Sequence, residues 1–163
     1  MNSFLSKPWP LIILLAVVVV GAARADGKGE DLAIIVNSAN KLENVTLNDL
    51  QRYFKVEKSK TPDGLKLVVL MQDTGRPERE AALKNIYKMT EAQYTTFFVE
   101  ATFTGAVASA PKSFPSAAAV KKYVAATPGA ISYVLDSDLD DTIKAVKVDG
   151  KSPGDPGYQP KAK

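Results

Sequence analysis

The sequence predicts a small α/β domain in which a mixed sheet is flanked by about four helices. Two observations lead to this class. The continuous apolar run Leu32–Val36, and the run Leu65–Met71 that is apolar except for Lys66, are typical of buried strands. Between such runs, apolar residues recur at helical spacing behind residues that cap helices. The elements follow the order β-α-β-α-α-α-β-β without an internal repeat, which favours a single α/β domain.

The first predicted strand, Leu32–Val36, leads through a polar loop to the first predicted helix. Thr46 is placed to cap that helix, and Asp49 stands three residues later as a weaker form of the capping-box acid. The apolar residues then recur at i, i+3 and i+7, and they are Leu47, Leu50 and Phe54. This spacing predicts an amphipathic helix of about ten residues.

The second strand and second helix follow a strong turn signal at Thr61–Gly64, where proline and glycine each occupy a favourable position. Leu65–Met71 is the predicted strand. Pro77 suits the first turn of a helix, and the acidic residues beside it complement the helix dipole. The apolar stripe of this helix consists of Leu83, Ile86 and Tyr87.

Two further helices and two strands complete the predicted domain. Thr90 and Gln93 form a capping box before an aromatic stripe, and Ser116 caps a fourth helix. Between these helices, Thr104–Pro115 reads as a long loop. The last two predicted strands are Ile131–Leu135 and Ile143–Val148. Residues 150–163 contain glycine, proline and lysine without an apolar pattern, so we predict a disordered tail there.

The composition excludes several classes of site. The 163 residues include no cysteine and no histidine, so disulfides, His- or Cys-ligated metals and nucleophilic sites that need histidine cannot be built from them. Chemistry is left to carboxylates, lysine, arginine, tyrosine, hydroxyls and the backbone. No pair of carboxylates stands out as a general acid and base. We therefore expect no catalytic residue, no metal and no cofactor.

The N-terminus has the pattern of an export signal. Lys7 precedes the ten-residue apolar run Leu11–Val20, and Ala23-Arg24-Ala25 follows as a small-x-small cleavage pattern. We predict a signal peptide over residues 1–25, with cleavage after Ala25. The run is shorter than the roughly 20 residues of a membrane-spanning helix. An uncleaved N-terminal anchor is the alternative.

Removal of this segment lowers the net charge of the chain, which changes what the charge implies about partners. The full chain has 21 basic and 18 acidic residues, a net charge of +3 and a pI near 9.0. Loss of Lys7 and Arg24 leaves 19 basic residues against 18 acidic, a net charge of +1. The signal for a nucleic-acid partner therefore almost disappears.

The most informative local feature is the junction between the second strand and the second helix, Gln72–Arg79. Free backbone N–H groups and the positive end of the dipole make a helix start a ready anion site. Thr74 adds a hydroxyl donor, and Arg76 or Arg79 adds a planar guanidinium. The alternative is an ordinary βα loop whose arginines pair with neighbouring acids.

Two other polar segments have simpler interpretations. Asp136–Asp141 begins like a calcium loop, but its sixth residue is Asp141 where glycine is required, and its twelfth is Lys147 where glutamate is required. A solvated turn between strands explains it better. The lysine-rich segment from Lys55 to Lys60 reads as a solubilising surface.

The whole pattern resembles phosphate ABC-transporter substrate-binding proteins of the periplasmic binding protein type II superfamily, and the resemblance covers about residues 32–148. The segment Val45–Phe54 resembles the family's "slsl-eLr-iF-G" helix, and Gly75–Ala81 resembles its Gly-Ser-x-x-Arg-Glu-x-Phe anion loop and helix start. Further similar segments are Leu32–Asn37, Pro62–Gly64, Val68–Leu70, Phe103–Gly105 and Val120–Val134, the last being the most specific.

Two differences from that family are visible. Its members have two lobes and about twice this length, so the chain resembles its short, single-lobe branch. Arg76 stands where the family has the serine of its anion loop, and Ser132 where it has the glycine of a Gly-Tyr pair. Arg76 either retains anion affinity or blocks the site.

The resemblance and the residues together give a set of expectations. Residues 1–25 are a signal peptide, 26–149 a single periplasmic-binding-protein-like domain, and 150–163 a tail. The protein is expected to be periplasmic and non-enzymatic, and to bind a small oxyanion such as phosphate. The expected ligands are Asp73, Thr74, Gly75, Arg76 and Arg79. The alternative is an interaction module that has lost ligand binding and docks to an envelope or periplasmic partner. A transporter or an envelope protein is the expected protein partner; neither nucleic acid nor a membrane span after cleavage is expected.

Overall fold

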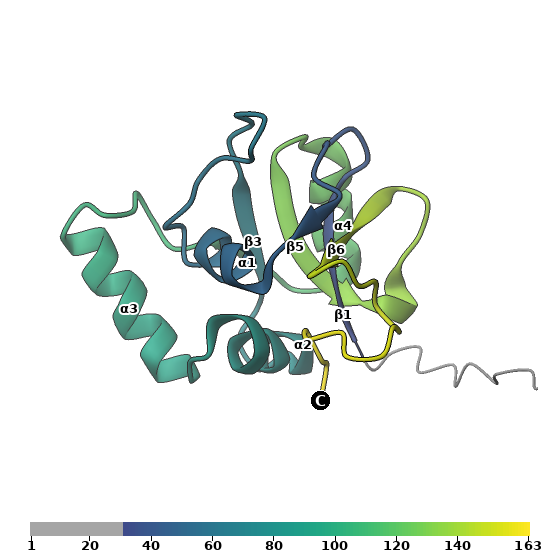
Figure 1. Ribbon diagram of the computed structural model, residues 1–163. Helices are drawn as coiled ribbons and strands as arrows, with labels where there is room; N and C mark the ends of the chain where they lie inside the picture. Colours follow the sequence, from purple (N-terminus) through teal and green to yellow (C-terminus); the bar gives the residue numbers. More distant parts are fainter. Residues whose placement is uncertain (1–30) are drawn as a thin grey trace, which may run out of the picture.

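A mixed six-stranded sheet forms the centre of the protein, in a computed structural model that describes residues 31–163 (Figure 1). The predicted signal peptide lies outside the described residues. The strand order is β2-β6-β1-β5-β3-β4. Strand β1 is antiparallel to β5 and β6, whereas β3 is parallel to β4 and β5. The strands are β1 Leu32–Asn37, β2 Asn44–Val45, β3 Val68–Gln72, β4 Lys112–Phe114, β5 Ala130–Leu135 and β6 Ile143–Val148. The predicted α/β class with a mixed sheet is confirmed.

Helices cover both faces of this sheet. The helices are α1 Leu47–Phe54, α2 Pro77–Ala82, α3 Glu91–Phe103 and α4 Ala117–Ala126, with a π-helical turn η1 at Leu83–Tyr87 and a 3-10 turn η2 at Asp136–Asp138. Helices α1 and α2 and turn η1 pack on one face, and α4 packs on the other. Within residues 31–163, no helix combines the length and the apolar character needed to cross a membrane.

Strand β1 shows why its sequence reads as a continuous apolar run. Leu32, Ile34 and Val36 belong to the core under α1 and α2. Ala33 and Ile35 belong to the core under α4. All five side chains are fully buried. These five positions are apolar because neither side of the sheet faces water there. The last residue, Asn37, is buried but polar, and its amide donates to the carbonyls of Val124 and Ala125.

The three predicted helix caps are confirmed. Thr46 Oγ1 accepts a hydrogen bond from the backbone N–H of Asp49 at 3.0 Å. Thr90 and Gln93 form the reciprocal capping box, because each side chain accepts from the other residue's backbone N–H. Ser116 Oγ accepts from the N–H of Ala119 at 3.2 Å. These local signals set the starts of α1, α3 and α4.

The shortest strands were not predicted. Strand β2 has two residues and pairs with β6, and β4 has three residues and pairs with β3. Strand β4 lies inside the segment that we expected to be a long loop. Two or three residues are too few to show a hydrophobic period, so only pairing with a neighbouring strand defines these elements.

The prediction of a disordered tail is wrong for the described chain. Tyr158 is 2% exposed, and its hydroxyl donates to the carbonyl of Leu32 at 2.8 Å. Lys161 Nζ lies 2.7 Å from Asp31 Oδ1, and the backbone N–H of Gly154 donates to the same carboxylate at 2.7 Å. The chain therefore ends packed beside α2 (Figure 1). One buried aromatic ring and one buried carboxylate hold an irregular segment that has no periodic pattern to predict it.

Candidate anion-binding site

The predicted strand-to-helix junction exists, and it forms a tight, exposed turn. Strand β3 ends at Gln72, and α2 begins at Pro77. The N–H of Asp73 donates to the carbonyl of Phe114 in β4 at 2.9 Å, and the carbonyl of Asp73 accepts from the N–H of Arg76 at 3.2 Å. Gly75 has a φ of +84°, a backbone conformation that other residues adopt only with strain. Asp73, Thr74 and Gly75 are exposed, so solvent reaches the whole turn.

The start of α2 keeps the properties that favour an anion at a helix N-terminus. Arg76 occupies the N-cap position with an extended backbone, and its side chain forms no capping hydrogen bond. Pro77 follows at the first helical position. Pro77 has no N–H, and the N–H groups of Arg76 and Arg79 donate to the carbonyls of Asp73 and Arg76. Of the first residues of α2, Glu78 therefore supplies the backbone N–H that is left to solvent or to a ligand. The helix continues from Ala82 directly into the π-helical turn η1, so the helical segment extends to Tyr87.

Arg79 lies beneath the turn and is fully engaged with protein groups. It is 4% exposed. Its Nε and Nη2 donate to the two carboxylate oxygens of Glu91 at 2.9 and 2.7 Å, and its Nη1 donates to the carbonyl of Gln72 at 2.9 Å. The guanidinium also stacks over the ring of Tyr94, 4.8 Å from its centroid. Arg79 thus joins the end of β3 to the start of α3.

The same ion pair sets the charge state of its two members. The hydrogen bonds with Glu91 raise the pKa of Arg79, and those from Arg79 lower the pKa of Glu91. Both groups are therefore charged across the physiological range. The positive charge of Arg79 is largely cancelled at short range, which leaves little of it for a ligand in the turn.

Arg76 is the more available of the two predicted arginines. Its side chain is 41% exposed, and its Nη2 lies 3.5 Å from Glu78 Oε1, a long contact for an ion pair. Its Nε is buried and has no protein partner. Thr74 lies close by, with its hydroxyl 3.5 Å from Glu91 Oε1. The structure thus groups Thr74, Gly75 and Arg76 on the surface, with Arg79 below them.

Sequence reasoning missed two buried polar groups at this junction. Gln72 is fully buried, and neither its amide nitrogen nor its amide oxygen has a protein partner. Glu78 is 6% exposed, and its Oε2 also lacks a partner. Burial of such groups without hydrogen bonds is costly, so they need a water molecule or a bound group. A polar residue at the end of an apolar strand, as in Met71-Gln72, was the signal in the sequence.

Carboxylates outnumber guanidiniums around the turn. The acidic residues of the turn, of the first turn of α2 and of the Arg79 ion pair are Asp73, Glu78, Glu80 and Glu91. The basic ones are Arg76 and Arg79. The surroundings are therefore net negative, which opposes an anion, while the backbone donors and Arg76 favour it. Glu91 was not predicted because it comes from α3, and no local pattern in the sequence links it to Arg79.

Buried tyrosines lie on the inner side of the junction. The hydroxyl of Tyr133 accepts from the backbone N–H of Gln72 at 3.2 Å. Burial raises the pKa of Tyr133, and burial also raises the pKa of Tyr94 to about 12. Both phenols are therefore neutral at physiological pH, which makes them unsuited to act as general bases.

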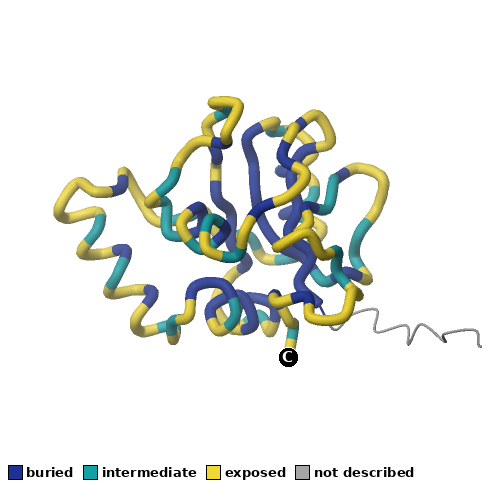
Figure 2. The backbone as a smooth tube through the Cα atoms, in the orientation of Figure 1, coloured by how far each residue is buried: buried dark blue, intermediate teal, exposed yellow. Residues whose placement is uncertain are grey.

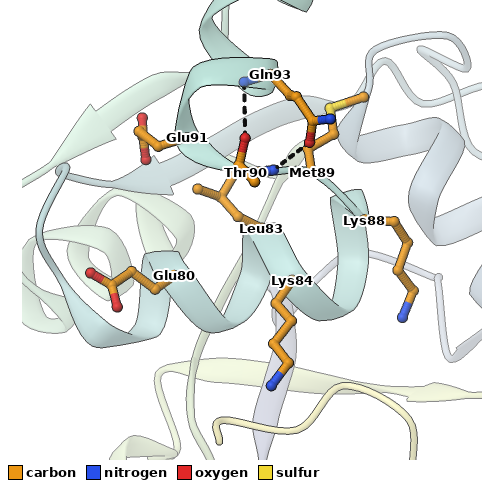
Figure 3. Close-up of a pocket in the computed structure, with 8 residues that line it drawn as sticks. All are labelled: Glu80, Leu83, Lys84, Lys88, Met89, Thr90, Glu91 and Gln93. Carbon is orange, nitrogen blue, oxygen red and sulfur yellow. Dashed lines mark hydrogen bonds between the residues drawn. The ribbon is translucent and has the colours of Figure 1, made fainter.

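A surface depression of about 670 Å³ lies next to the junction, between turn η1 and the start of α3 (Figure 3). Its apolar part includes Leu83 and Met89, and its rim carries both acidic and basic side chains. None of the five predicted ligands lines it. The lining residues are Glu80, Leu83, Lys84, Lys88, Met89, Thr90, Glu91 and Gln93.

The acidic loop after β5 has no metal-binding geometry. Asp140 Oδ2 lies 2.6 Å from Lys121 Nζ, and this contact, followed by hydrogen bonds from Thr142, lowers the pKa of Asp140 to about 2. Across residues 31–163, no three acidic side chains come close enough together to hold a metal ion.

Comparison with known proteins identifies the fold. No family model and no curated protein matches the chain. Among solved structures, an ABC-type phosphate transport receptor from Vibrio cholerae aligns with a TM-score of 0.62 at 18% identity, over 76% of this chain and 48% of that one. A phosphate ABC-transporter substrate-binding protein from Clostridium perfringens, solved with bound phosphate, aligns with a TM-score of 0.61 at 20% identity, over 74% and 46%.

A third solved structure agrees with these two. PstS from Borrelia burgdorferi aligns with a TM-score of 0.57 at 14% identity, over 76% of this chain and 49% of that one. The chain thus spans less than half the length of each of these three proteins. At such low identity the likeness is one of fold. The described chain has the fold found in phosphate ABC-transporter substrate-binding proteins, over about half of such a protein.

Proposed function

We propose that the protein is an exported, non-enzymatic binding protein that holds a small oxyanion, with phosphate as the first candidate, at the Asp73–Arg76 turn. One observation carries the proposal: an exposed turn at an uncapped helix start, in a fold shared with a protein solved with bound phosphate. The N-terminal segment of residues 1–25 supports export to the periplasm.

Each predicted residue has a distinct role in this proposal. The ligand accepts hydrogen bonds from backbone N–H groups of the turn and of the helix start, from the Thr74 hydroxyl and from the Arg76 guanidinium. Gly75 allows the chain to make the turn at its positive φ. Asp73 holds the turn closed through the hydrogen bond between its carbonyl and the N–H of Arg76. Arg79 is a positioning residue, since Glu91 and Gln72 already occupy its donors.

The proposed affinity is weak. The turn is open to solvent, so water competes for every donor, and a small ligand is bound tightly only when most of its surface is enclosed. The surrounding carboxylates oppose an anion further. We expect a dissociation constant in the millimolar range, corresponding to about −4 kcal/mol.

Titration calorimetry with phosphate and with sulfate tests this proposal. Binding heat is expected at millimolar anion, and Arg76→Ala is expected to weaken binding at least fivefold. Arg52→Ala is the matched control, because Arg52 on α1 is similarly exposed and also contacts one carboxylate, but it does not belong to the junction. Absence of heat up to tens of millimolar anion, or equal binding by Arg76→Ala and the unaltered protein, would overturn the anion site.

A second function is favoured by the excess of carboxylates around the turn, which opposes an anion there. In this alternative, the protein is an interaction module that has lost ligand binding and docks to an envelope or periplasmic partner. Capture from a periplasmic extract that persists without phosphate or sulfate, together with no calorimetric binding of either anion, favours this alternative.

A further inference from the structure

Helix α3 carries apolar side chains on two opposite faces. The inner face packs against η1 through Tyr94 and Phe98, which are 5% and 3% exposed. This is the stripe that the sequence predicted. The outer face consists of small or apolar residues that are all exposed, namely Ala92, Thr96, Val99 and Phe103. Figure 2 shows buried and exposed positions alternating along this helix, which lies at the edge of the molecule.

The outer face has the spacing of a helix–helix seam. Its residues are separated by four, three and four positions, the repeat by which two helices pack along their length. Val99 is 63% exposed and Phe103 is 91% exposed. A helix that is apolar on opposite sides is normally covered on both. Among residues 31–163, nothing buries Val99 and Phe103.

The side chains are small at one end of this seam and large at the other, which favours pairing with the same seam of a second copy. Ala92 and Thr96 are small, and they border a shallow depression of about 330 Å³ with Gln93, Phe97 and Glu100. Val99 and Phe103, at the other end, protrude. Large side chains pack best against small ones on the facing helix.

We propose that two copies of the protein pair through this outer face of α3, with the two helices antiparallel across a two-fold axis. Phe103 of one copy then lies against Ala92 of the other, and Val99 lies against Thr96. Since such an interface is isologous, each contact occurs twice. A parallel pair would instead place Phe103 against Phe103 and leave a gap between the two Ala92 residues.

The charged side chains along the seam are compatible with the antiparallel arrangement. In that register the carboxylate of Glu100 faces the uncharged Gln93 of the other copy, so no two acids oppose each other across the seam. The dipoles of antiparallel helices also attract at their ends. A 13-residue helix is about 20 Å long, so the contact area is below that of a permanent interface, and self-association is weak and depends on concentration.

Sedimentation equilibrium of the purified protein tests for self-association. We expect a reversible dimer whose dissociation constant rises at least tenfold in Val99→Lys, because each copy then buries an ammonium group in the seam. Thr102→Lys is the matched control, since it adds the same charge to the same helix outside the four seam positions. Circular dichroism confirms that both variants fold. A monomer at all concentrations, or equal weakening by both variants, would overturn the proposal.

Disulfide trapping tests the orientation, and the absence of cysteine from the chain makes it specific. Ala92→Cys and Phe103→Cys are oxidised separately and as a mixture. The antiparallel register predicts a crosslink between the two variants in the mixture and little in either alone. In this register the two copies of residue 92 lie about 16 Å apart along the helix axis, as do the two copies of residue 103, which is too far for a disulfide. If Ala92→Cys crosslinks with itself, the pair is parallel. If Ala92→Cys stays monomeric and its introduced thiol is protected from modification, residues 1–30 cover the outer face instead. Either outcome refutes the antiparallel dimer.

Discussion

Tyr158→Ala is expected to destabilise the protein severely, although it lies in a segment whose composition is that of a disordered tail. The Tyr158 side chain is 2% exposed and belongs to the larger core cluster. Its hydroxyl donates to the backbone carbonyl of Leu32, the first residue of β1, at 2.8 Å. Truncation therefore removes a buried ring from the core and a donor from a buried carbonyl.

The expected size follows from these two contributions. Replacement of a buried aromatic side chain by alanine costs about 3–5 kcal/mol through lost burial and the cavity left behind. Loss of the hydroxyl alone, in Tyr158→Phe, costs about 1 kcal/mol, because the Leu32 carbonyl loses its partner. With a denaturant slope of about 2 kcal/mol per molar urea, Tyr158→Ala shifts the unfolding midpoint by about 2 M.

Urea unfolding followed by far-ultraviolet circular dichroism measures these changes. Gln159→Ala is the control, since Gln159 is exposed and adjacent, and its free energy of unfolding should stay within about 0.5 kcal/mol of that of the unaltered protein. If Tyr158→Ala behaves like Gln159→Ala, the tail does not pack on β1 and the reasoning is refuted.

The remaining predictions concern the Arg79–Glu91 pair and two glycines. Arg79 lowers the pKa of Glu91 below its ordinary value of 4.5, so the pair stabilises the fold fully above that pH and loses its effect as the pH falls through the lower, folded value. The melting temperature should therefore fall less steeply between pH 5 and pH 3 in Glu91→Gln than in the unaltered protein. The same slope in both proteins would contradict this prediction. Gly129→Ala should destabilise by about 3 kcal/mol or more, because a Cβ would overlap the carbonyl of Lys66. Gly75→Ala should lower the free energy of unfolding by only about 1–2 kcal/mol, because the positive φ is strained for alanine but nothing lies within 4 Å of an added Cβ. Equal urea midpoints for the two glycine variants would contradict this distinction.

Local signals were sufficient for most of the fold. The caps at Thr46, Thr90 and Ser116 were predicted because a side chain bonds a backbone group three residues away in the sequence. Strand β1 was predicted because both of its faces are buried, which makes its first five residues, 32–36, apolar. A cap lies within one segment, and burial on both faces leaves an unbroken apolar run within one segment, so both can be recognised from the local sequence.

The candidate site was predicted only in part. The turn, Gly75 and the helix start follow from residues adjacent in sequence, and the structure brings Thr74 and Arg76 together on the surface. The role of Arg79 could not be predicted from the sequence, because its partner Glu91 lies on another helix, twelve residues further along the chain. A guanidinium suited to an anion ligand is equally suited to a carboxylate of the protein itself.

The sequence alone determined the α/β class, the order of the main elements and the position of the exposed turn, because periodicity, caps and turn residues act over a few positions. Only the tertiary structure decided which groups meet across long separations: Arg79 with Glu91, Tyr158 with Leu32, and Phe114 with Asp73. It also decided that α3 buries one apolar stripe and exposes the other. These outcomes depend on which surfaces face each other after folding, and no single segment contains that information.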